Sequence, residues 1–258
     1  MSQKEQCLNC NETVSQHFCP NCGQKTNTHR ITLEHFIKQD ILHGVWHFEK
    51  GILFTLKEAL LRPGKAALDY ISGKRIRYYN VFYLTLLLIG LNILLLHFYD
   101  NFKTNSTLTP NDVDTTPNIT KFLADNVKFI LFCIVPILGC NSYLVFRRLK
   151  LNIAEHFIIG GMCLLGMVQL TILFSFSNFL NEQFSFKFLG IIEVISFFLI
   201  VLFPFWCYYN SIKNRYTFLG SLWRLVVFYI LVLIQIQLIL AIIVLTITNG
   251  DGSFIISL

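Results

Sequence analysis

The chain has 258 residues, of which 54% are hydrophobic and 14% are charged, and its mean hydropathy is +0.56. Soluble domains carry about 25% charged residues, so this composition excludes a water-exposed surface over most of the chain. A formal net charge of +6 is also a property of nucleic-acid-binding proteins. We expect no nucleic-acid partner, because the basic residues flank apolar segments and do not cover one soluble face.

Four cysteines near the start of the chain form two Cys-x2-Cys pairs separated by eight residues: Cys7 with Cys10, and Cys19 with Cys22. Two such pairs can complete a tetrahedron around Zn²⁺ with Zn–S bonds of about 2.3 Å. Gly23 suits a turn with positive φ after the last cysteine. The sequence therefore predicts a zinc ribbon over residues 1–28, folded by its metal. A redox dithiol pair and an iron–sulfur cluster are the alternatives.

All four coordination positions of this site are filled by sulfur, so the predicted zinc is structural and has no open position for an activated water. Whether the chain is an enzyme stays undecided, and the closed site argues against zinc hydrolysis. No apolar leader precedes the cysteines. We therefore expect the N-terminus in the cytosol, where thiols stay reduced. Nearby Arg30 could offset the charge of the thiolates.

Residues 29–80 are predicted to form amphipathic helices that lie at the membrane surface. Thr32 can cap a first helix, a second covers Ile52–Leu61 until Pro63, and a third runs from Lys65 to Ser72 before Gly73. Basic side chains along this segment would face anionic lipid. The alternative is a small soluble helical domain that docks on the membrane part.

Asp40, His43 and His47 fall on one face of a helix in this segment. Three such ligands could hold a second metal with one vacant position. The simpler interpretation is that both histidines lie at the interface beside Trp46 and that Asp40 pairs locally.

Residues 81–258 contain five apolar segments of about the 20 residues that a bilayer requires. They are Val81–Tyr99, Val127–Phe146, Phe157–Leu180, Phe188–Tyr209 and Leu222–Thr248. The expected fold class is an all-α polytopic membrane protein with about five transmembrane helices, preceded by the zinc ribbon and the interfacial helices. Five buried helices of a soluble protein are the alternative, but they would lack any polar face.

Basic and less basic connections alternate between these segments. Arg75 and Arg77 precede the first span, Arg147 and Arg148 follow the second, and Arg215 lies between the fourth and fifth. The positive-inside rule then places the N-terminus in the cytosol and the C-terminus outside. The expected location is the bacterial inner membrane, crossed several times.

Ionisable groups inside a bilayer are functional candidates because they are costly there. Glu193 in the fourth span is the clearest, with Lys187 or Gln169 as possible partners, and solvation in the headgroup region is the simpler interpretation. Glu155 and His156, at the inner end of the third span, form the best candidate proton-relay pair.

A second group of motifs follows the cysteines: Arg30-Ile-Thr32, Thr55-Leu-Lys-Glu-Ala-Leu60, Arg62-Pro-Gly64, Gly73-Lys-Arg75 and Tyr78. Together with Cys7–Gly23 and the following Gln24, they resemble an uncharacterised bacterial family of zinc-ribbon integral membrane proteins, catalogued as a domain of unknown function. The resemblance covers residues 1 to about 90. It implies a membrane protein with a cytosolic zinc module and transfers no activity.

Three functions remain open. The first is a binding or assembly and regulatory role, in which the zinc ribbon contacts a protein partner at the lipid bilayer. The second is a small-solute or ion transporter or channel that uses Glu193. An intramembrane enzyme would require His43, His47, Glu155 or His156 to converge on one cavity. The oligomeric state and the partner or solute cannot be inferred from the sequence.

Overall fold

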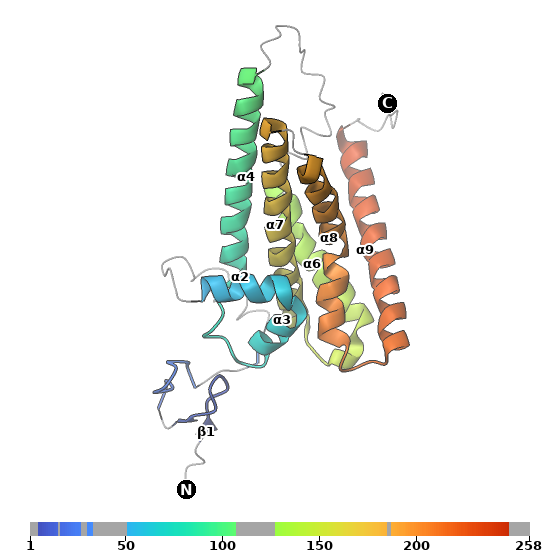
Figure 1. Ribbon diagram of the computed structural model, residues 1–258. Coiled ribbons are helices and arrows are strands. Elements are labelled where there is room, and N and C mark those ends of the chain that lie inside the picture. The colour runs from blue at the N-terminus through green and yellow to red at the C-terminus, as the bar shows by residue number, and fades with distance from the viewer. Residues whose placement is uncertain are drawn as a thin grey trace.

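The computed structural model describes residues 5–14, 16–26, 30–32, 51–106, 127–184 and 187–247. The described elements are β1 (Glu5–Gln6), β2 (Thr13–Val14), α2 (Ile52–Leu61), α3 (Pro63–Ile71), α4 (Val81–Ser106), α6 (Val127–Val145), the short 3-10 helix η2 (Arg147–Leu149), α7 (Ile153–Phe184), α8 (Lys187–Ile212) and α9 (Phe218–Ile247). Figure 1 shows a bundle of long, roughly parallel helices with a small module below its lower end.

Four helices are long and apolar enough to cross a membrane, through Val81–Tyr99 of α4, Ile153–Asn181 of α7, Phe188–Ile212 of α8 and Phe218–Ile243 of α9. The helix α6 coincides with the second predicted span, and its apolar stretch is the shorter Cys133–Val145. The helical fold class with about five long apolar helices is therefore confirmed, and the chain is a multi-pass membrane protein.

The helix α7 is the centre of the bundle and contacts α2, α3, α4, α6 and α8. In its apolar part 61% of the residues are buried, against 6% in α9, which contacts α6 and α8 at the edge of the bundle (Figure 1). Small residues allow this packing. A Cβ atom on Gly139 would lie 2.1 Å from the ring of Phe157, and one on Gly166 would lie 2.2 Å from the ring of Phe203.

The helices α2 and α3 lie across the lower part of the bundle, against α7 and α8 (Figure 1). At Gly64 the contact with α8 is so close that a Cβ atom would lie 2.2 Å from the carbonyl oxygen of Cys207. The indole N–H of Trp206 donates to the carbonyl oxygen of Leu61 at 3.3 Å, which satisfies a free group at the end of α2. These contacts hold α2 and α3 against the bundle.

The predicted bounds of α2 are confirmed, but α3 begins at Pro63 and not at Lys65. Proline has a φ angle suited to the first helical turn, where its missing N–H costs nothing, so Pro63 starts α3 as well as ending α2. The first predicted helix, after Thr32, lies outside the described residues.

Beside a proline inside α8, a side chain of α9 forms hydrogen bonds with the backbone of α8. One turn of α8 contains Pro204, and beside it the hydroxyl of Tyr229 accepts from the N–H of Phe205 at 2.7 Å. The same hydroxyl donates to the carbonyl oxygen of Val201 at 3.1 Å. Tyr229 thus bridges two groups that would bond directly in a regular helix, and it ties α9 to α8.

Candidate metal centre

The two cysteine pairs adopt the same backbone turn. In each pair the carbonyl oxygen of the first cysteine accepts a hydrogen bond from an N–H four residues later, at 2.9 Å, from Asn11 in one and Gly23 in the other. These two residues have positive φ angles of 62° and 74°. The sequence predicts the positive φ at Gly23. The positive φ at Asn11 was not predicted, although asparagine tolerates this conformation better than most residues.

Short strand pairings close both turns. The strands β1 and β2 pair antiparallel around the first turn, and Phe18 forms an antiparallel bridge with Lys25 around the second. The buried core of the module consists of Cys7, Val14 and Cys19, with the other two cysteines packed against them. Such a small apolar core cannot stabilise a fold by itself.

The four sulfur atoms all lie within 4.8 Å of one another. The Sγ atoms of Cys7 and Cys22 are 3.6 Å apart, and those of Cys10 and Cys19 are 3.5 Å apart. A tetrahedron with Zn–S bonds of about 2.3 Å has edges of about 3.8 Å, so the sulfur set fits one tetrahedral ion. This is the one potential metal-binding group within the described parts of the chain.

The surroundings shift the pKa values of two of these thiols in opposite directions. A backbone hydrogen bond with Glu12 lowers the pKa of Cys10, but burial and the other three cysteines outweigh it and raise the pKa to about 12. Burial raises the pKa of Cys22, yet hydrogen bonds from Asn9 and the Gln24 backbone bring it down to about 6. Metal ligands of this type bind as thiolates, so a bound cation would hold the four cysteines in their deprotonated form.

The module rests on the loop between α3 and α4. From the first turn, the backbone and side-chain oxygens of Asn9 accept from the guanidinium of Arg77, at 3.2 and 2.9 Å. From the second turn, the side-chain amide of Gln24 donates to the carbonyl oxygen of Gly73 at 2.7 Å. Leu8 packs on Gly73, whose φ of 106° favours glycine over residues with a side chain. Both turns therefore contact residues 73–77.

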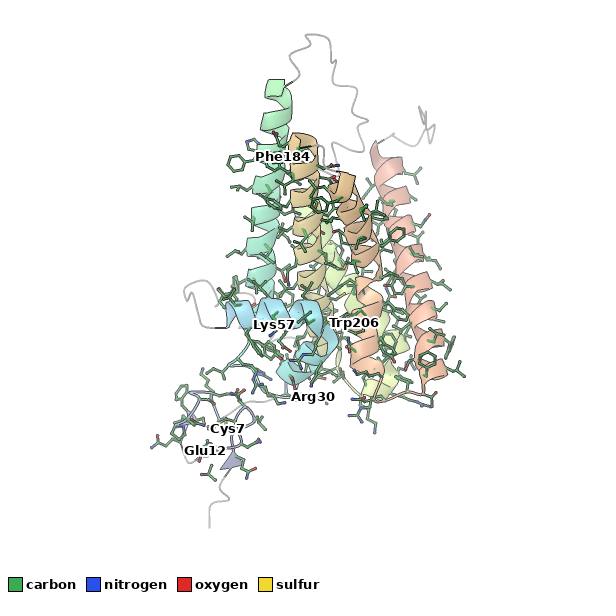
Figure 2. All side chains as sticks on the ribbon, in the orientation of Figure 1. Cys7, Glu12, Arg30, Lys57, Phe184 and Trp206 are labelled. Carbon is green, nitrogen blue, oxygen red and sulfur yellow. The ribbon has the colours of Figure 1, made fainter. Side chains whose placement is uncertain are left out.

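Arg30 links the end of the module to the bundle, as Figure 2 shows by its place between Cys7 and the lower helix ends. Its guanidinium donates two hydrogen bonds of 2.9 Å to the carboxylate of Glu155. This carboxylate also accepts from the N–H of Asn152 at 2.8 Å, while the Asn152 side chain accepts from the N–H of Glu155 at 2.9 Å. Glu155 is thus part of a capping box at the start of α7.

Arg30 was expected to offset the thiolate charge, and its partner is Glu155 instead. The ion pair raises the pKa of Arg30 above its ordinary value through its hydrogen bonds to the carboxylate. Local sequence patterns could not predict this contact, because the two residues are 125 positions apart.

Glu155 and His156 have different partners despite being neighbours in the chain. The buried ring of His156 shares a 2.7 Å hydrogen bond through Nδ1 with Ser142 of α6, and Tyr143 packs edge-on against it. The described hydrogen bonds do not join His156 to Glu155. The proton-relay role stays a prediction.

Glu193 of α8 pairs with a residue of the neighbouring helix α7. With its amide oriented to satisfy both groups, Nδ2 of Asn178 lies 3.1 Å from each carboxylate oxygen of Glu193. Gln169, the partner considered from the sequence, donates within its own helix to Leu165 at 3.4 Å. Comparable links join Asn141 to Gln235 at 2.8 Å, so polar contacts between helices are a general feature of this bundle.

The candidate second metal site, formed by Asp40, His43 and His47, lies outside the described residues. The predicted outer C-terminus, residues 249–258, lies outside them as well.

Comparison with protein families matches residues 49–89 to a family described as a protein of unknown function, DUF3667. Comparison with curated proteins and with solved structures finds no significant match. The matched residues comprise α2, α3, the loop that holds the cysteine module, and the start of α4. The similarity to an uncharacterised family thus lies in the part that connects the module to the bundle.

Proposed function

We propose that this chain is an integral protein of the bacterial inner membrane whose cytosolic zinc ribbon serves as a docking platform for a protein partner. The observation that carries the proposal is that part of the module is held against the rest of the chain while another part stays exposed. Its two cysteine turns rest on residues 73–77, while Phe18, next to Cys19, keeps 54% of its surface exposed. A fixed module with an exposed aromatic residue is suited to recognition.

Zinc is the metal that this donor set fits best. Four thiolates in a tetrahedral arrangement are typical of structural zinc, and a soft sulfur set of this kind disfavours calcium and magnesium. In this role the metal holds the turns in shape, and Leu8, Asn9 and Gln24 then contact the rest of the chain. Phe18 is presented to the partner.

Crosslinking in native membranes, followed by affinity purification of the full chain, tests the partner role. We expect Phe18→Ala to lose the crosslinked partner while zinc content stays at one ion per chain. The matched control is Leu219→Ala, which removes an exposed apolar side chain of α9. Equal recovery of partners by the wild type and Phe18→Ala, or an equal loss in the control, would contradict the proposal.

The orientation is proposed from the basic connections. Arg75 and Arg77 border α4, and Arg147, Arg148 and Arg215 border the other helices at the same end of the bundle. Reporter fusions at the two termini test it. A cytosolic signal at the N-terminus and an external signal at the C-terminus agree with the proposal, and signals on the same side would overturn it.

A further inference from the structure

A cavity of about 410 Å³ lies where α6 ends and α7 begins, and its walls are Tyr143, Arg147, Leu151 and His156. This volume is within the range of small-molecule sites, which is about 300–1,000 Å³. The cavity is at the end of the bundle that carries the basic connections. It is separate from the cysteine module and from Glu193.

Arg147 supplies the positive charge of this cavity. Among the described residues no carboxylate forms a salt bridge with it. Its neighbour Arg148 differs, because that guanidinium packs over the ring of Tyr216 at 5.4 Å. The exposed Arg147 guanidinium is therefore available to an anion, and its fork of N–H donors suits phosphate oxygens.

Ser142 holds the ring of His156 in the wall of the cavity. The hydroxyl of Ser142 lies 3.0 Å from the carbonyl oxygen of Gly139 and 2.7 Å from Nδ1 of His156. The ring of His156 is only 1% exposed, so it shapes the wall of the cavity. Arg147 and Tyr143, which are both exposed, supply the polar groups that a ligand reaches.

An apolar surface leads along α6 to the same cavity. Pro136, Cys140 and Leu144 are exposed at intervals of four residues, and Tyr143 is 45% exposed beside them. This spacing places them on one face of the helix. Because the bundle is surrounded by lipid, the face offers a path for acyl chains that ends next to Arg147.

We propose that this cavity binds the headgroup of an anionic phospholipid such as phosphatidylglycerol. The phosphate accepts hydrogen bonds from Arg147 and the hydroxyl of Tyr143, and the buried ring of His156 forms the wall behind it. The acyl chains lie along Pro136, Cys140 and Leu144. Basic pockets between transmembrane helices at the cytoplasmic side bind other anionic lipid headgroups in the same way.

Native mass spectrometry of the full chain in detergent, titrated with defined lipids, tests this site. The wild type should bind phosphatidylglycerol about tenfold more tightly than phosphatidylcholine, because the guanidinium of Arg147 favours a headgroup with a net negative charge. Arg147→Gln should remove this preference, and Tyr143→Phe should reduce it. Arg215→Gln, which removes an exposed arginine from another connection, is the matched control and should leave it unchanged.

Three results would overturn the proposal: Arg147→Gln keeps the preference, Arg215→Gln loses it equally, or free glycerol 3-phosphate competes as well as the lipid does. The last outcome would identify a soluble phosphate ligand. Should Arg147→Gln fail to fold, a photoactivatable phosphatidylglycerol provides the test on the wild type. Crosslinks within residues 133–156 support the site, and crosslinks confined to other helices refute it.

Discussion

The cysteine module and the helical bundle are stabilised in different ways. The module has a buried core of Cys7, Val14 and Cys19, whereas the bundle has a continuous core that extends from α2 to α9. The module is thus expected to require a bound metal, and the bundle depends on close helix packing in lipid. The two regions should therefore respond independently to metal removal and to packing changes.

The largest effect is expected from removing metal ligands. Cys19→Ser with Cys22→Ser should abolish zinc binding and unfold residues 5–26, because structural zinc contributes about 10–16 kcal/mol in zinc-finger peptides. Helix content by circular dichroism should hardly change. Cys133→Ser with Cys140→Ser, two exposed cysteines of α6, is the control and should keep one zinc per chain by elemental analysis. Loss of zinc from the control would refute the assignment.

A packing change should affect the bundle alone. Gly64→Ala places a Cβ atom 2.2 Å from the backbone of α8, and overpacking of this kind costs about 1–3 kcal/mol or more. Gly90→Ala is the matched control, since no atom lies within 4 Å of its added Cβ. We expect thermal unfolding in detergent at a lower temperature for the first variant only. Equal unfolding temperatures would show that α3 does not rest on α8.

The ion pair between Arg30 and Glu155 connects the two regions. Glu155→Gln should destabilise the chain by about 1.5–3 kcal/mol, because a buried carboxylate loses charged hydrogen bonds. A double-mutant cycle with Arg30→Gln should give a combined cost well below the sum of the single costs. Strict additivity would mean that the two side chains do not interact.

The smallest effect is expected at the contact of the module with its loop. Gln24→Ala removes the hydrogen bond to Gly73, which is worth about 1 kcal/mol. Hydrogen exchange at residues 73–77 should become faster while the zinc content is unchanged. The exposed Gln16→Ala provides the control. Unaltered exchange in Gln24→Ala would contradict this docking contact.

Local signals in the sequence predicted the parts of the fold that depend on local order. Hydropathy located the long helices, and the spacing of cysteines located the module with the turn at Gly23. The start of α3 at Pro63 could also have been predicted, since proline is frequent in the first helical turn. The pairing of Arg30 with Glu155 and of Asn178 with Glu193 could not, because it depends on how distant segments pack.

Hydrogen exchange of the full chain, measured in detergent with and without a zinc chelator, tests the independence of the two regions most directly. We predict that the chelator removes the protection of residues 5–26 and leaves residues 153–180 of α7 as protected as before. Protection of residues 5–26 that persists without metal, or loss of protection in α7 at the same chelator concentration, would contradict the account.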